Sequence, residues 1–154
     1  MKTLIAFYSR TDITRQVALN LKDMLDADIE EVKDTDKRAG IIGYLKSGFQ
    51  ASRKKLTTLE ELKYDHADYE LVIIGTPVWA GKMSIPIRTY LHQNQEIKNL
   101  AVFSTYGGSG LEGTIKDLAD YTGKTPLATL GLRKKTVEAG EYQDELEEFK
   151  NKLI

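Results

Sequence analysis

One stretch near the N-terminus decides the fold: Thr3-Leu4-Ile5-Ala6-Phe7-Tyr8-Ser9-Arg10-Thr11-Asp12-Ile13-Thr14. Its first half is a short, continuous apolar run of the kind found in buried β-strands. Its second half is polar, and the apolar residues that follow recur at the spacing of one helix face, at Ile13, Val17, Leu21, Met24 and Leu25. We therefore predict a strand, a hydroxyl-rich loop and a helix, which together begin an α/β domain.

The same alternation continues along the chain. Similar apolar runs occur at residues 3–8, 28–33, 71–75, 100–104 and 126–132. Helical patterns separate them, which favours a parallel sheet covered on both faces. The length of 154 residues is that of one domain. We predict a single α/β domain, residues 1–154, with a doubly wound five-stranded parallel sheet.

The segment between the second and third predicted strands is too long for a simple connection. Within it a helix is predicted, with one face formed by Ile41, Ile42, Leu45 and Phe49. From Lys33 to Lys55 the chain carries seven basic and two acidic residues, although the whole chain has a net charge of −1. This helical insertion is either a solvated surface helix or a docking patch for an acidic partner or nucleotide phosphates.

Composition excludes several kinds of chemistry. Cysteine is absent, so redox chemistry requires a bound cofactor, and two histidines are few for an imidazole metal site. The balance of 22 basic and 23 acidic residues gives no field that would attract nucleic acid. The N-terminal apolar run is too short for a signal peptide or a membrane span. We expect a cytoplasmic protein with neither a nucleic-acid nor a membrane partner.

Function is expected in the loops at the carboxyl ends of the strands. In the first loop, the hydroxyls of Ser9, Thr11 and Thr14 lie beside the N–H groups of the first helical turn, and Arg10 adds charge. Such a loop suits a phosphate dianion, although helix capping alone would also account for the hydroxyls.

Two further loops carry aromatic residues beside glycines. After the third predicted strand the chain reads Gly75-Thr76-Pro77-Val78-Trp79-Ala80-Gly81, and after the fourth it reads Thr105-Tyr106-Gly107-Gly108-Ser109-Gly110. Glycines let the backbone approach a flat ligand, and indole or phenol rings can stack on it. Core packing of Trp79 and a plain glycine turn are the alternatives.

In these loops the sequence resembles the flavodoxin family of FMN-binding redox proteins. The family's N-terminal signature is matched by Phe7, Ser9, Thr14, Ala18 and Leu21. Ala6 replaces a larger apolar residue, and Asp12 replaces the usual Gly, Ala or Cys. The segments Thr76-Pro77-x-Trp79-x-Gly81 and Tyr106-Gly107-Gly108-x-Gly110 are similar to the loops that enclose the flavin in that family.

The resemblance implies a flavodoxin-like fold and FMN as cofactor, with no catalytic side chain and no metal ligand. The first loop would hold the phosphate, and the other two would hold the ribityl chain and ring, with Trp79 and Tyr106 stacked on the flavin. The implied cofactor-binding residues are Ser9, Arg10, Thr11, Asp12, Ile13, Thr14, Thr76, Pro77, Val78, Trp79, Ala80, Gly81, Ser104, Thr105, Tyr106, Gly107 and Gly108.

Two functions remain open. One is an electron-transfer flavoprotein that works between a reductase and an acceptor protein. The other is an oxidoreductase whose FMN takes hydride from NAD(P)H and reduces a quinone or a similar small molecule. The near-zero net charge argues against the strong steering that small carriers use.

Asp12 is the residue that fits the family least. A carboxylate beside a phosphate repels it. Asp tolerates the left-handed turn that Gly usually makes, and its side chain can point to solvent or pair with Arg10 or Arg15. We therefore predict that FMN binds, but more weakly than the rest of the loop would allow.

Overall fold

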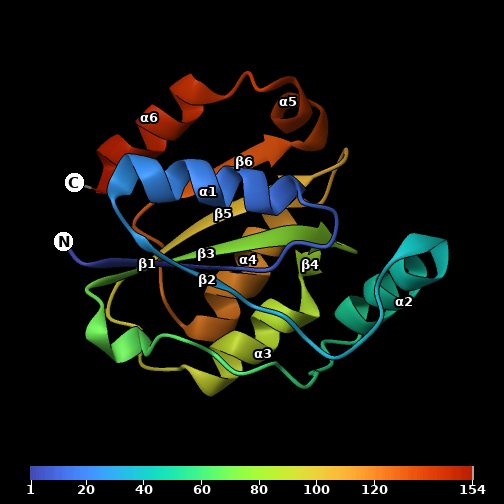
Figure 1. Ribbon diagram of the computed structural model, residues 1–154. Helices are drawn as coiled ribbons and strands as arrows, with labels where there is room; N and C mark the ends of the chain where they lie inside the picture. The colour runs from blue at the N-terminus through green and yellow to red at the C-terminus, as the bar shows by residue number, and fades with distance from the viewer. Residues whose placement is uncertain (154) are drawn as a thin grey trace.

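The computed structural model describes residues 1–153, and in it a parallel sheet lies between two layers of helices (Figure 1). Five strands pair in parallel in the order β2-β1-β3-β5-β6, and a short sixth strand, β4, pairs antiparallel with β3. Their bounds are β1 Thr3–Phe7, β2 Asp28–Glu31, β3 Leu71–Trp79, β4 Lys82–Met83, β5 Leu100–Tyr106 and β6 Thr129–Arg133. The predicted doubly wound α/β fold is confirmed.

The helices divide between the two faces of the sheet (Figure 1). One face carries α1 (Ile13–Leu25), α5 (Lys134–Ala139) and α6 (Gln143–Leu153). The other carries α3 (Ile85–Gln93) and α4 (Leu111–Thr122). The alternation of side chains along each strand separates two apolar cores, since Ile5 packs with the first group and Leu4 with the second.

One predicted loop is a hairpin. The third strand was expected to end at Gly75, but β3 continues to Trp79, where Val78 and Trp79 pair with β4. Ala80 and Gly81 make the turn with φ of 52° and 73°. Two successive positive φ angles are what a tight two-residue hairpin requires, and Gly81 supplies one of them without strain. The hairpin holds Trp79 at a fixed place beside the sheet edge.

The insertion between β2 and β3 contains α2 (Gly40–Ser52) and a 3₁₀ helix at His66–Asp68. On α2 the small residues Gly43, Ser47 and Ala51 face the body of the protein. The predicted apolar face points outward, and Ile41, Ile42, Leu45 and Phe49 are all exposed. Along residues 1–153 the structure has no helix that is both apolar enough and long enough to cross a bilayer.

Candidate functional site

A cavity lies at the carboxyl ends of the strands, where the strand order reverses between β1 and β3. In sheets of this kind, that reversal opens a crevice between the loops. The cavity has a volume of about 190 Å³. It is lined by Arg10, Thr11, Ile13, Thr14, Tyr44, Pro77, Val78, Trp79, Thr105, Tyr106, Gly107 and Lys134. All three predicted loops therefore meet at one place.

The first wall is the loop between β1 and α1. Its N–H groups at residues 11–14 have no hydrogen-bond acceptor within the described part of the chain. The hydroxyl oxygen of Ser9 accepts a hydrogen bond from the N–H of Arg15 at 3.1 Å, and this contact leaves the O–H donor of Ser9 unused. Free N–H groups at the positive end of a helix favour an anion. The guanidinium of Arg10 lines the same cavity and donates a hydrogen bond to the carbonyl of Arg38 at 3.4 Å.

Thr14 joins this wall to the third one. Its hydroxyl lies 2.8 Å from the hydroxyl of Thr105, and both residues are buried. The hydrogen bond links the start of α1, which follows β1, to the end of β5, and β1 and β5 lie on opposite sides of β3 in the sheet order. It therefore fixes the distance between the anion-binding loop and the aromatic loop.

Asp12 occupies the N-cap of α1 in the left-handed conformation, with φ of 67°. Its carboxylate makes no capping hydrogen bond and pairs instead with the guanidinium of Arg15, which also pairs with Glu31. The side chain is 68% exposed. The structure has the left-handed turn that aspartate tolerates, and of the alternatives for the side chain it shows pairing with Arg15 together with exposure to solvent, so this carboxylate is solvated and partly neutralised.

The second wall is built around Trp79, whose side chain is only 6% exposed. Tyr8 meets it edge to face, with the ring centroids 5.3 Å apart. The guanidinium of Arg38 lies 4.9 Å from the centre of the indole ring. Trp79 therefore has a packing role within the protein in addition to forming part of the cavity wall. Its stacking on a flavin stays a prediction.

Tyr8 is buried beside Trp79 and near the guanidinium groups of Arg38 and Arg10. Burial, reinforced by the nearby carboxylate of Asp34, raises the pKa of Tyr8 from its usual 10.0 to about 12. The guanidinium groups of Arg38 and Arg10 act in the opposite direction on the same pKa. The phenol therefore stays neutral over the whole physiological range.

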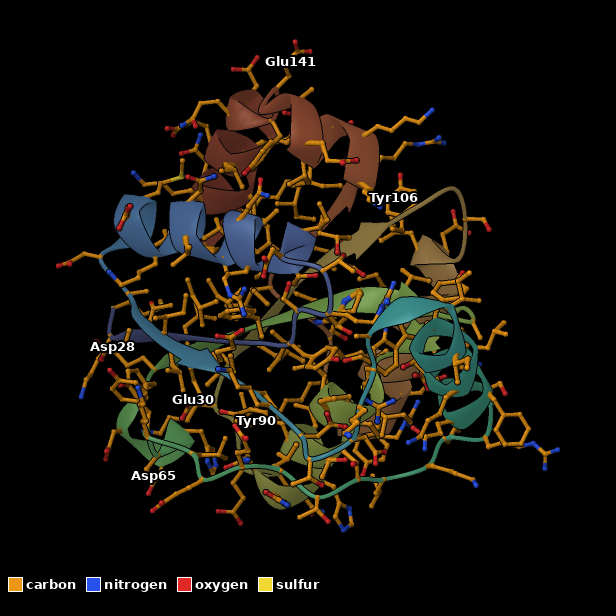
Figure 2. The ribbon with its side chains drawn as sticks, turned by 45° about the vertical axis from the view of Figure 1, so that its right-hand side comes forward. Asp28, Glu30, Asp65, Tyr90, Tyr106 and Glu141 are labelled. Atoms are coloured by element: carbon orange, nitrogen blue, oxygen red, sulfur yellow. The ribbon has the colours of Figure 1, made fainter. Side chains whose placement is uncertain are left out.

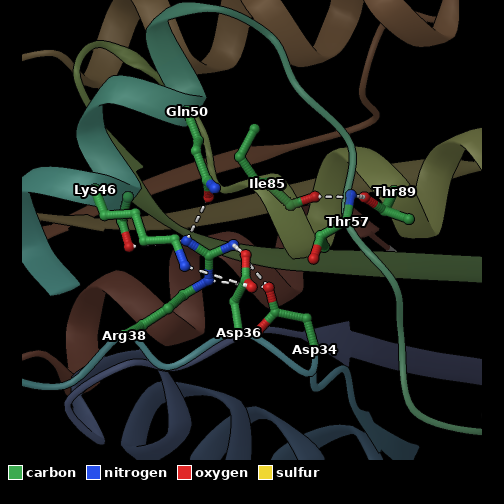
Figure 3. A network of polar contacts seen from close by, with 9 residues as sticks. Asp34, Asp36, Arg38, Lys46, Gln50, Thr57, Ile85 and Thr89 are labelled. Atoms are coloured by element: carbon green, nitrogen blue, oxygen red, sulfur yellow. Dashed lines mark hydrogen bonds and ion pairs between the residues drawn. The ribbon is translucent and has the colours of Figure 1, made fainter.

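Arg38 ties α2 to this wall (Figure 3). It is 4% exposed and donates two hydrogen bonds to Asp34, of 2.7 and 2.9 Å. It also donates to Ser47 at 3.0 Å and to Gln50 at 2.9 Å, both on α2. The basic segment seen in the sequence thus includes one buried, neutralised arginine, and that arginine sets how α2 sits.

The third wall is the end of β5, where Tyr106 lies at the tip of the sheet (Figure 2). The guanidinium of Arg133 lies 5.7 Å from the centre of its ring. Gly107 follows, and a Cβ atom at that position would meet nothing within 4 Å. Packing within the chain does not require a glycine there, so its small size leaves room for something outside the chain.

The structure brings most of the predicted site residues together and turns others away. Those lining the cavity are Arg10, Thr11, Ile13, Thr14, Pro77, Val78, Trp79, Thr105, Tyr106 and Gly107. Two predicted residues are fully buried: the Thr76 hydroxyl accepts from the N–H of Ser84, and the Ser104 hydroxyl donates to the carbonyl of Thr76. Those that lie outside the cavity lining are Ser9, Asp12, Thr76, Ala80, Gly81, Ser104 and Gly108.

Sequence reasoning missed two lining residues. Lys134 directly follows β6, so its place at the carboxyl edge of the sheet was a usable signal. Tyr44 comes from α2, where the guanidinium of Arg10 lies 5.4 Å from the centre of its ring. No sequence pattern linked Tyr44 to the first loop, because the approach of α2 to the cavity is a tertiary feature.

Comparison with known proteins agrees with this geometry. The sequence profile of the Flavodoxin family matches residues 2–152, and the chain belongs to that family. No curated protein sequence matches the chain.

Solved structures share the fold. A flavoprotein from Lactobacillus acidophilus, crystallised in complex with FMN, is 24% identical, with a TM-score of 0.72 over 90% of this chain and 97% of that one. A flavoprotein from Bacteroides uniformis is 24% identical, with a TM-score of 0.72 over 90% and 96%. A flavodoxin from the domain Archaea is 14% identical, with a TM-score of 0.54 over 98% and 92%.

Proposed function

We propose that this protein binds FMN in the cavity between its three loops and works as an electron-transfer flavoprotein. One observation carries the proposal: a single cavity joins the free N–H groups at the start of α1 to a wall of aromatic rings and exposed backbone. A phosphorylated flat ring system matches both parts. FMN in the similar Lactobacillus acidophilus flavoprotein supports the same ligand.

Different residues of the chain would bind the phosphate and the ring of the ligand. The N–H groups of residues 11–14 and the guanidinium of Arg10 would hold the phosphate. Trp79 and Tyr106 would flank the ring, and the Thr14–Thr105 hydrogen bond would keep the two binding regions at a constant separation. The bound flavin would supply the redox chemistry itself, by accepting and releasing electrons.

The size of the cavity supports transfer to another molecule. At about 190 Å³ it is smaller than pockets that enclose a whole ligand of this size. Part of the cofactor would therefore lie at the protein surface. An exposed edge would be within reach of a docked redox partner.

A flavin titration tests the ligand assignment. We expect about one FMN per chain, with quenching of flavin fluorescence and a perturbed visible spectrum. Riboflavin, which has the same ring and lacks the phosphate, should bind more weakly. Equal affinity for FMN and riboflavin would contradict the assignment of the first loop to the phosphate.

An NAD(P)H-dependent oxidoreductase is the second candidate, and the net charge of −1 favours it, because small carriers commonly use strong charge for steering. NADH and NADPH oxidation by the FMN-loaded protein, measured with and without a soluble quinone, separates the two. Rapid quinone-dependent oxidation would assign the enzyme. Reduction only by a separate reductase would assign the carrier.

A further inference from the structure

Helix α2 has the reverse of the usual amphipathic arrangement. Its small residues Gly43, Ser47 and Ala51 face the protein, while Ile41 and Ile42 are 79% and 83% exposed. Leu45 and Phe49, one and two turns beyond Ile41, are exposed as well. Soluble helices normally place such residues against the core, and a contiguous exposed apolar patch marks an interaction surface. We call Ile41, Ile42, Leu45 and Phe49 the outer face of α2.

This orientation is fixed by specific contacts. A Cβ atom at Gly43 would lie 2.2 Å from the backbone of Arg38, so only glycine permits the observed approach. The guanidinium of Arg38 then donates to Ser47 on the inner side of α2. It also donates to Gln50 of the same helix (Figure 3). Rotating the helix to bury its outer face would break these hydrogen bonds and leave Arg38 buried without them.

Basic residues precede and follow α2 in the chain, and two of them lie against its outer face. Lys37, Arg53, Lys54 and Lys55 are exposed, and none of them takes part in an ion pair within residues 1–153. The guanidinium of Arg53 and the ammonium of Lys55 lie 5.1 and 5.6 Å from the centre of the Phe49 ring. An apolar ridge with free cations at its margin is complementary to a surface that is apolar inside and anionic at its boundary.

We propose that α2 docks this protein on the surface of a membrane containing anionic phospholipids. The outer face would enter the boundary between headgroups and acyl chains, and the basic residues would contact the lipid phosphates. Such a helix lies in the membrane plane and does not cross the bilayer. From the sequence we expected no membrane partner, but the sequence did not show which side of α2 faces out.

Shape and charge favour the lipid surface over other occupants. In Figure 1, α2 projects from the side of the molecule as a ridge, and a bilayer can receive a ridge without a matching groove. Lysine is depleted in protein interfaces, whereas in-plane membrane helices are rich in it. In a second copy of the chain, pairing through α2 would bring two rims of the same positive charge together.

The position of α2 gives the docking a consequence for the site, which rests on the proposed function. Tyr44 is an exposed residue of α2 and also lines the cavity. A membrane bound at the outer face would therefore lie beside the mouth of the cavity. Redox partners that reside at the membrane, including lipid-soluble quinones, would then meet the flavin directly.

Vesicle co-sedimentation tests the docking. The full chain, with and without FMN, is mixed with vesicles of phosphatidylcholine alone or of phosphatidylcholine with phosphatidylglycerol. We expect at least about tenfold stronger binding to the anionic vesicles, reduced by high salt. Because binding is measured on both forms of the protein, failure of the membrane proposal can be told apart from failure of the FMN proposal.

Three variants locate the contact. Replacing Ile41, Leu45 and Phe49 together by serine should lower vesicle binding at least about tenfold, with an unchanged melting temperature because these side chains are exposed. Replacing Arg53, Lys54 and Lys55 by glutamate should abolish the preference for anionic lipid. The matched control replaces two exposed leucines elsewhere, Leu19 and Leu127, by serine and should bind as the wild type does.

Several results would overturn the proposal. One is wild-type protein that stays in the supernatant with anionic vesicles, and another is a serine variant that binds as well as the wild type. A dimer in sedimentation velocity that the serine variant dissolves would assign the outer face to a second copy. Salt-sensitive electron transfer to an acidic protein, lost in the same variant without any vesicle binding, would assign it to a protein partner.

Discussion

Removing the carboxylate of Asp12 should tighten the binding of FMN. The residue sits at the N-cap of α1, beside the free N–H groups assigned to the phosphate, and its side chain makes no capping hydrogen bond. Its only ion-pair partner within residues 1–153 is Arg15. Three substitutions separate the charge from the backbone geometry: Asp12→Asn, Asp12→Gly and Asp12→Ala.

The size of the effect follows from the exposure of the side chain. At 68% exposure the carboxylate interacts through a dielectric close to that of water. Two unit charges about 6 Å apart then repel by about 0.7 kcal/mol, or about 1.4 kcal/mol for a dianion. Arg15 cancels part of this repulsion, so we expect a gain of about 1 kcal/mol. That gain corresponds to roughly fivefold tighter binding in Asp12→Asn and Asp12→Gly.

Asp12→Ala is the control for conformation. It removes the same charge but places a Cβ without a polar group at φ of 67°, which disfavours the folded state by about 1 to 2 kcal/mol. Its melting temperature should fall, whereas those of the Asn and Gly variants should not. The three variants therefore report electrostatics and backbone strain separately.

The assay is quenching of flavin fluorescence during titration at low ionic strength, with FMN and riboflavin in parallel. Riboflavin affinity should not change, because riboflavin lacks the phosphate, and added salt should reduce the gain for FMN. Unchanged FMN affinity in both the Asn and Gly variants would refute the electrostatic reasoning. Weaker FMN binding in both would mean that the carboxylate makes a contact with the ligand.

Three further predictions concern the second wall. Trp79→Ala should weaken the binding of FMN by about 1 to 3 kcal/mol and restore flavin fluorescence in a titration. The same variant should lower the melting temperature, whereas Trp79→Phe should keep most of the packing with Tyr8. Arg38→Ala should lower the free energy of unfolding in urea by about 3 to 5 kcal/mol, because it leaves the buried carboxylate of Asp34 unpaired. A decrease of less than about 1 kcal/mol would contradict the role of Arg38 in neutralising Asp34. The raised pKa of Tyr8 means that its contribution to stability is complete below pH 10 and is lost as the pH rises to about 12. Tyr8→Phe should therefore remove about 2 to 3 kcal/mol of the alkaline loss of stability, and an identical pH profile in the variant would argue against it.

The fold, and the edge of the sheet at which the three predicted loops meet, could be predicted from the sequence alone. Apolar runs of strand length, separated by helical patterns, leave a buried parallel sheet as the way to cover both strand faces. The carboxyl ends of parallel strands share one edge, so the loops after β1, β3 and β5 had to meet. For Asp12, the tolerance of aspartate for a left-handed turn is a local property, and it could be predicted without knowing the rest of the molecule.

Tertiary structure decided everything that depends on distant contacts. From the sequence Trp79 was predicted to lie in a loop. It is instead the last residue of β3, because that strand continues far enough to pair with β4 in a hairpin, and its ring packs beneath Arg38. Helical periodicity shows that α2 has an apolar side, but not which side meets the protein. The orientation of α2 is set by the close approach of its backbone to Arg38 at Gly43 and by the hydrogen bonds of Arg38. These contacts leave the apolar side of α2 exposed.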